Sequence, residues 1–301
     1  MRNETYFGPH FFEHYRALGF AHFVIYDDRS DEPFRSFLED QPDCTIICSD
    51  SKFDDHFGLK ADGTPRRLPS FLKETLPSKV LKDRWVLAVD ADEFLVLPPG
   101  VSTIQAFTQI LDAAGRLYST APMVDCYGET LGHHDFDPAL SPFAGNPFFD
   151  AGPYYRWAGK ATPKVIQAGI RHRLLSMLYR LDRARVHEIY SNKPKLAALW
   201  KVPLVKEGAG VKRVGDHGIN QAPDGDLACA LAHFKFYPGM TARVETAITE
   251  GQYYNGSIEY RFLQEALKRM GDRSLIAPMT RRFSGPQSLV EAGLLPVGDA
   301  A

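Results

Sequence analysis

The chain has 301 residues, of which 44% are hydrophobic and 24% charged, and its formal net charge is -2. This composition is that of an ordinary globular protein, long enough for one large α/β domain or two small ones. Because 35 Lys and Arg residues balance 37 Asp and Glu residues without a long run of one sign, the charge gives no support to nucleic-acid binding.

The four cysteines lack the spacing of a metal site, so we expect reduced thiols in a cytoplasmic protein. The sequence contains no stretch of about 18 apolar residues, so we expect no transmembrane segment. Peripheral association with a membrane is compatible with this composition.

Helical and strand patterns alternate over the first 130 residues. In chain order we expect a helix between Pro9 and Gly19, strands at 23–26 and within 41–50, a helix over 68–83 broken at Pro77, a strand over 84–94, a helix over 101–115 capped by Ser102, and a strand over 116–128. Such alternation predicts an α/β fold with a mostly parallel central sheet flanked by helices.

The second half of the chain has a different texture. Residues 132–159 lack periodicity and read as a long loop, in which His133, His134 and Asp135 are polar candidates for a ligand contact. Short strands are expected at 201–205 and 227–237, and helices at 239–251 and 257–271. We expect one domain over residues 1–283, with halves meeting near residue 130, and a loose tail over 284–301.

Three acids interrupt an apolar stretch in the segment "DRWVLAVDADEFLVLP". Asp90 and Asp92 follow the strand and would lie at the ligand-binding edge of the sheet. Two carboxylates two residues apart can hold one Mg²⁺ or Mn²⁺ ion, which such sites share with a substrate phosphate. A solvated acidic turn is the alternative, and the strand before Asp90 favours the metal site. Glu93 is expected to be structural, holding an arginine or a backbone amide.

Asp27 and Asp28 end another strand. A carboxylate there could accept hydrogen bonds from a uracil N–H or from ribose hydroxyls, and a turn that ends the strand explains the pair about equally well.

Two further segments carry candidate residues. His233 lies in an apolar strand, where a lone histidine is more often a packed core residue, but beside the Asp90 strand it could complete a metal site. Lys235 would face the same side and meet phosphate. Arg171 and Arg173 suit a diphosphate or a sugar carboxylate, with a solvated basic face equally plausible.

Seven blocks of sequence carry a resemblance to a known family. "RNETYF…HYRALGFAHFVIYDDRSD", "WVLAVDADEFLVLP", "MVDCYG", "GIRHRL", "KVPLV", "HFKF" and "GQYYNGSIEYR" stand in the same order as in bacterial glycosyltransferase family 2-like proteins of the GT-A fold. The chain resembles that family over roughly residues 2 to 270.

The resemblance implies a nucleotide-diphosphate-sugar donor, expected to be a UDP-sugar, and a glycan or other hydroxyl acceptor, as in cell-surface polysaccharide synthesis. It implies a divalent cation, Mn²⁺ or Mg²⁺, on Asp90 and Asp92 with His233 as a further ligand. It also implies a nucleotide pocket that includes Asn3, Glu4, Asp27 and Asp28.

Family 2 members generally invert the anomeric centre, which requires a carboxylate base for the acceptor hydroxyl. Glu259 is our candidate, because it follows an aromatic and polar loop. The alternative is that Glu259 lies in the first turn of a helix, where the helix dipole alone favours an acid. Glu245, Asp125 and Glu129 remain open for the same role.

Two other functions compete with this one. A strand that ends in D-x-D also occurs in haloacid-dehalogenase-like phosphatases, but those proteins have a small residue and Thr or Val after the motif, where this chain has Glu93 and Phe94. A protein of the same fold that binds nucleotide sugars or carbohydrates without turnover is the second alternative.

Overall fold

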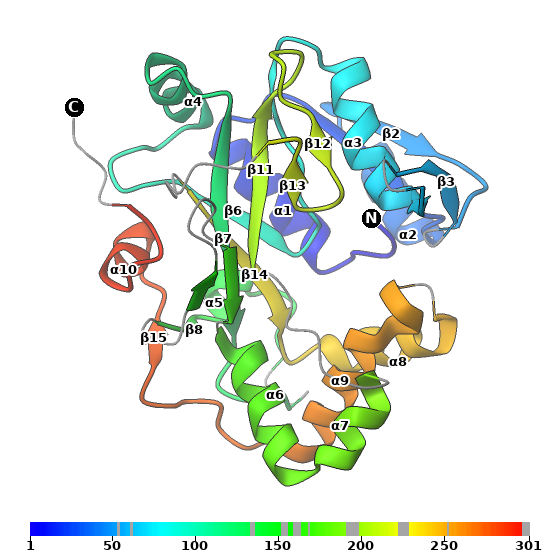
Figure 1. Ribbon diagram of the computed structural model, residues 1–301, viewed down its shortest axis with the longest axis vertical. Coiled ribbons are helices and arrows are strands. Elements are labelled where there is room, and N and C mark those ends of the chain that lie inside the picture. Colours follow the sequence, from blue (N-terminus) through cyan, green and yellow to red (C-terminus); the bar gives the residue numbers. More distant parts are fainter. Residues whose placement is uncertain are drawn as a thin grey trace. The chain divides into compact units, whose positions relative to one another are not determined.

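The computed structural model (Figure 1) shows an α/β protein. It describes residues 1–52, 55–60, 63–132, 136–151, 156–158, 164–167, 169–190, 199–221, 229–251 and 253–296. The chain forms two compact units, and it passes from one to the other within β7 (Tyr118–Tyr127) and β11 (Trp200–Lys206). Unit 1 contains Met1–Ser119 and Val202–Gln221, and unit 2 contains Thr120–Lys201 and Ala222–Val297.

Unit 1 contains the elements from α1 to α4, most of β11, and the short strands β12 and β13. Apart from β11, they are α1 (Phe7–Ala17), β1 (Phe23–Asp27), α2 (Glu32–Glu39), β2 (Cys44–Cys48), β3 (His56–Leu59), β4 (Pro65–Arg67), α3 (Leu68–Val80), β5 (Trp85–Leu87), β6 (Glu93–Val96), α4 (Ile104–Ala113), β12 (Arg213–Val214) and β13 (Gly218–Ile219).

Aromatic side chains form the core of unit 1. Phe7, Phe11 and Tyr15 lie on one face of α1 and are buried, as their spacing predicts. The centre of the Phe11 ring lies 6.3 Å from the ring centre of Phe23 in β1 and 6.4 Å from the ring centre of Phe94 in β6. The Tyr15 hydroxyl also donates to the carbonyl oxygen of residue 93. Helix α1 is therefore fixed against the strand that follows the D-x-D segment.

The boundaries of two helices differ from the predicted ones. Helix α3 continues through Pro77 to Val80, and the Pro77 carbonyl accepts a hydrogen bond from the Leu81 amide, so proline does not break this helix. Helix α4 is capped by Thr103 instead of Ser102, because the Thr103 hydroxyl accepts from the Ala106 amide at 3.2 Å.

Unit 2 contains the second set of elements. They are the larger part of β7, then α5 (Pro142–Gly145), β8 (Phe148–Asp150), β9 (Arg156–Ala158), β10 (Lys164–Gln167), α6 (Gly169–Leu181), α7 (Arg183–Tyr190), β14 (Ala230–Phe236), α8 (Met240–Glu250), α9 (Tyr254–Met270), β15 (Thr280–Arg282) and α10 (Pro286–Glu291). Helices α6, α7 and α9 pack against one another (Figure 1).

The expectation of a mostly parallel sheet is wrong, because the strand pairing is mixed. Strands β1 and β2 are parallel, as are β7 and β14. Strands β5 and β11 are antiparallel, as are β7 and β8, and β8 and β15. The antiparallel partners return from distant parts of the sequence, so the local alternation of strands and helices in the first 130 residues could not reveal them.

Two segments are more ordered than their sequences suggest. The stretch predicted as a long loop over 132–159 contains α5, β8 and β9, and His133, His134 and Asp135 lie outside the described residues. The tail predicted to be loose contains α10, with Leu289 and Leu294 buried. Within the described residues, none of the helices has the length and apolar character that a membrane crossing requires.

Candidate functional site

The acids that end β1 have different surroundings. Asp27 is buried, and its carboxylate accepts from the Ser30 amide at 3.2 Å and from Arg35 at 3.1 Å. These bonds form the turn that ends the strand. Asp28 is also buried, and the polar contact described for its carboxylate is a long one to Arg29 at 3.3 Å. Burial raises the pKa of Asp28, although Arg29 opposes this effect.

Asn3 is held against the following turn. Its side-chain oxygen accepts from the Asp31 amide at 2.8 Å, and its amide nitrogen donates to the Asp31 carboxylate at 2.7 Å. These paired bonds connect the chain ahead of α1 to the chain after β1. The predicted contact of Asn3 with a nucleotide stays a prediction.

Glu93 fixes the D-x-D turn between β5 and β6. Glu93 is 1% exposed, and its carboxylate accepts a hydrogen bond from the Asp90 amide at 2.8 Å. The Glu93 amide in turn donates to the Asp90 carbonyl at 3.1 Å. The prediction that Glu93 is structural and anchors a backbone amide is confirmed. The two reciprocal bonds hold the Asp90–Glu93 turn in one conformation.

A lysine ammonium already lies against Asp90. Lys73, from α3, donates to the Asp90 carboxylate at 2.7 Å, and the Asp90 side chain is 52% exposed. Burial opposes the charge on Lys73, but Asp90, Asp216 and Glu93 outweigh burial and raise the lysine pKa. The Asp90 carboxylate therefore accepts a cationic partner at a position open to solvent.

Four predicted acids of unit 1 act through their charges on one group. Burial lowers the pKa of the Met1 amino group, and Glu4, Asp27, Asp90 and Asp28 all counteract this effect through their charges. The amino nitrogen donates to the Tyr26 carbonyl at 2.5 Å at the end of β1. Asp27 and Asp28 at the end of β1 and Asp90 after β5 thus all act on the charge of the same amino group.

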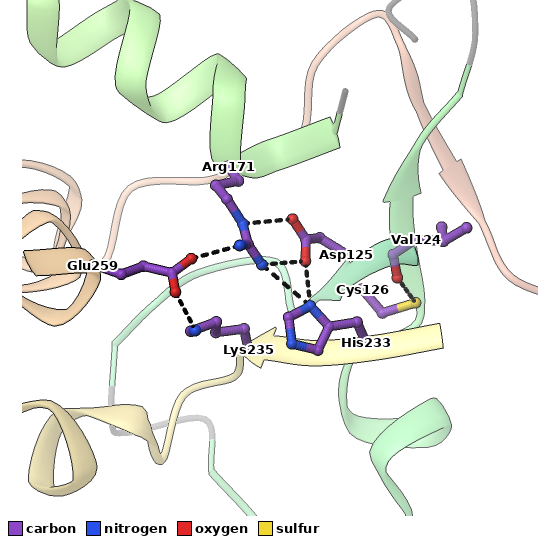
Figure 2. A network of polar contacts seen from close by, with 7 residues as sticks. All are labelled: Val124, Asp125, Cys126, Arg171, His233, Lys235 and Glu259. Atoms are coloured by element: carbon purple, nitrogen blue, oxygen red, sulfur yellow. Dashed lines mark hydrogen bonds and ion pairs between the residues drawn. The ribbon is translucent and has the colours of Figure 1, made fainter. Parts of the chain in front are cut away.

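A second polar cluster lies inside unit 2 (Figure 2). Parallel pairing of β7 with β14 places Asp125 beside His233, and α6 and α9 contribute Arg171 and Glu259. Lys235, two residues beyond His233, joins the same cluster through Glu259. Apart from Asp125, which was one of several open candidates for the base, the members are residues that the sequence singled out.

Arg171 connects the two carboxylates of the unit 2 cluster. Its guanidinium forms a two-pronged contact with Asp125, from Nε to Oδ2 at 3.1 Å and from Nη2 to Oδ1 at 2.9 Å. Its Nη1 donates to Glu259 at 2.5 Å. Burial opposes ionisation of Asp125, but the charge of Arg171 and the hydrogen bond from His233 hold the carboxyl pKa well below its usual range.

Glu259 accepts from two cations. Arg171 contacts Oε1, and the Lys235 ammonium contacts Oε2 at 2.6 Å while lying 5.2 Å from the centre of the Tyr260 ring. Burial alone would raise the pKa of Glu259, but Arg171 and Lys235 lower it to about 2. A general base works best with a pKa near the working pH, so Glu259 with both cations in place is a weak base.

The helix α9 begins at Tyr254, so Glu259 lies in its second turn, not its first as predicted.

Arg173 does not form a solvated basic face. It donates to the buried Asp150 at 2.9 Å and to the Leu275 carbonyl at 2.8 Å. The donors of Arg171 and Arg173 are thus directed at protein oxygens, and a phosphate contact for Arg171 or Lys235 stays a prediction.

Comparison with known protein families, with curated proteins and with solved structures finds no match for this chain. Among the described residues, no three His, Cys, Asp or Glu side chains form a group that could hold a metal ion by themselves. The roles of Asp90, Asp92 and His233 as metal ligands therefore stay predictions.

Proposed function

We propose that the protein is a metal-dependent glycosyltransferase that moves a sugar from a nucleotide-diphosphate sugar to an acceptor hydroxyl, with inversion of the anomeric centre. The observation that carries the proposal is the Asp90–Glu93 turn, which holds a half-exposed Asp90 carboxylate against the Lys73 ammonium at 2.7 Å, together with the buried Asp28 after β1. Carboxylates that follow two strands of one unit suit a cation together with the polar groups of a nucleotide.

The residues of the D-x-D turn fit a divalent cation. Carboxylate oxygens are the ligands that Mg²⁺ and Mn²⁺ prefer, and the Lys73 ammonium against Asp90 supports a cationic partner at this carboxylate. Asp90 and Asp92 would hold the ion, and the Glu93 bond to the Asp90 amide would keep the turn in place. A bound cation would neutralise the charge of the departing diphosphate.

Asp28 is our candidate for nucleotide recognition. It is buried at the end of β1, whereas the Asp27 carboxylate is occupied by Ser30 and Arg35. A carboxylate whose ionised form is disfavoured by burial gains from donors such as a uracil N–H or ribose hydroxyls. We therefore expect a UDP-sugar as donor and a glycan or another hydroxyl compound as acceptor.

The proposal is tested by transfer from UDP-, GDP- and dTDP-sugars with and without Mn²⁺. We expect transfer from one nucleotide class, dependent on the metal, and a loss of at least about 100-fold in Asp92→Asn. Asp112→Asn is the matched control, because Asp112 lies in α4 and pairs with Lys206 at the surface. Equal activity in both variants would mean that Asp92 has no role in the reaction.

The same assay separates the alternative functions. Donor binding without transfer or hydrolysis across a broad acceptor panel would indicate a carbohydrate-binding or nucleotide-sugar-binding protein. Release of phosphate from simple phosphomonoesters, lost in Asp90→Asn, would indicate the phosphatase. Either result would contradict the glycosyltransferase.

A further inference from the structure

Three polar side chains of α3 contact two different turns of unit 1. Ser70, Lys73 and Glu74 stand at helical spacing and therefore share one face of the helix. Lys73 donates to the Asp90 carboxylate in the D-x-D turn at 2.7 Å. Ser70 and Glu74 contact the turn between β12 and β13. One face of α3 therefore contacts both turns.

The β12–β13 turn is fixed by α3 and by the sheet. Ser70 donates to the Asp216 carboxylate at 3.1 Å, and the Gly215 amide donates to the Glu74 carboxylate at 2.6 Å. In β12, Arg213 is 7% exposed and donates to a carbonyl of β5 at 2.6 Å. Because β5 leads to the D-x-D turn, the two turns stand on connected parts of one unit.

Two carboxylates from different turns act on the Lys73 ammonium. Of the charges that counteract the burial of Lys73, that of Asp90 is the strongest and that of Asp216 the next. The Asp90 side chain is 52% exposed, and Asp216 is exposed as well. Both carboxylates therefore reach solvent, while the lysine on which they act is only 18% exposed.

We propose that Lys73 is a tethered cation that pairs with Asp90 until a divalent cation takes its place, and that Asp216 is the partner to which the ammonium then moves. The divalent cation belongs to the proposed function, on which this inference rests. Lysine carries a compact charge on a flexible four-carbon stem, so the ammonium can change its partner while α3 and both turns stay in place.

The exchange has an electrostatic reason. An ammonium 2.7 Å from the Asp90 carboxylate would repel a divalent ion on the same carboxylate at close range. A second carboxylate for the ammonium reduces this repulsion, and it spares the largely buried lysine the loss of its ionic partner. Lys73 therefore lowers the affinity of the site for a free metal ion, and Asp216 restores part of that affinity.

Isothermal titration calorimetry with Mn²⁺ alone tests the exchange. We expect Lys73→Met to bind Mn²⁺ about 10-fold or more tightly than the wild type, because the competing ammonium is removed. Lys206→Met is the matched control, because Lys206 donates to Asp112 at the same distance of 2.7 Å in unit 1. It should leave Mn²⁺ binding unchanged. Binding in Lys73→Met that is no tighter than in the wild type would overturn the proposal.

A second variant separates an exchange of partners from simple repulsion. Asp216→Asn should weaken Mn²⁺ binding by roughly 3- to 5-fold in the wild type and have no effect in Lys73→Met, because only the ammonium needs the second carboxylate. The asparagine oxygen can still accept from Ser70, so the turn keeps its shape. Equal weakening in both backgrounds would mean that Asp216 acts on the ion by its own charge, and unchanged binding in Asp216→Asn would mean that it has no role. Either result would overturn the exchange.

This inference and the proposed function can fail separately. Mn²⁺ binding that follows the expected pattern in a protein without sugar transfer would leave the exchange and contradict the proposed function. Mn²⁺ binding of one strength in all variants would contradict the exchange and leave the proposed function. A protein in which no variant binds Mn²⁺ would contradict both.

Discussion

Arg171→Met should be among the most destabilising single substitutions in unit 2. The Arg171 side chain is 10% exposed, and the Asp125 side chain that it contacts twice is fully buried. Removing the guanidinium leaves Asp125 ionised in the interior with His233 as its remaining described partner. Breaking a buried ion pair by removing one partner typically costs about 3–5 kcal/mol of unfolding free energy.

The matched control is Arg185→Met. Arg185 also forms ion pairs with two carboxylates, but its side chain is 35% exposed and Glu188 is 70% exposed, while the 9% exposed Glu265 keeps a second partner in Arg269. Pairs of this kind contribute about 0–1 kcal/mol. Urea unfolding of both variants at pH 7 measures the two free energies. Equal losses in the two variants would refute the conclusion that burial makes the Arg171 pair important.

A double variant separates the pair from its surroundings. If the loss in Arg171→Met comes from an unpaired buried charge, then Asp125→Ala combined with Arg171→Met should be less destabilised than the sum of the two single losses, by about 0.5–3 kcal/mol. Additive losses would mean that the two side chains stabilise the unit independently.

Three further predictions concern single contacts. Thr103→Ala should lower the unfolding free energy by about 1 kcal/mol and Ser102→Ala by much less, measured by urea unfolding, because Thr103 caps α4. Wild type should be more stable than Glu259→Gln above about pH 4.5, and this difference in unfolding free energy should disappear toward pH 2. The reason is that the lowered pKa of Glu259 makes folding favour the ionised form. A difference that does not change with pH would contradict this. Glu93→Ala should weaken Mn²⁺ binding, measured by calorimetry, by roughly 10- to 100-fold, because Glu93 holds the Asp90 amide.

Local patterns predicted part of unit 1, including α1, β1, β2 and β5, whereas α2, β3, β4, β12 and β13 were not predicted. Phe7, Phe11 and Tyr15 stand at helical spacing and form the buried face of α1, and the apolar run before Asp90 identified β5. The role of Glu93 was also predictable, because a buried acid three residues after Asp90 has the backbone amide of its own turn within reach. These features depend on residues that are close together in the chain.

The unit 2 cluster could be predicted only in part. His233, Lys235, Arg171 and Glu259 stood out as polar residues in apolar or helical segments. Asp125 was one of several open candidates for the base, but its place in the cluster could not be predicted, because its contact with His233 spans 108 positions and depends on the parallel register of β7 and β14. The antiparallel return of β11 beside β5 was hidden for the same reason. Pairing between distant strands is set by packing, which a local pattern does not record.

The central claim is that the acids of unit 1 bind a nucleotide sugar together with a divalent cation. A thermal-shift screen of UDP-, GDP- and dTDP-sugars with and without Mn²⁺ tests it most directly, since a ligand at 100 times its Kd adds about 2.7 kcal/mol of stability. We predict that one nucleotide class raises the Tm by roughly 5 °C in the presence of Mn²⁺ and not in its absence, and that Asp92→Asn abolishes the effect. A shift that persists without the metal, or in Asp92→Asn, would contradict the account.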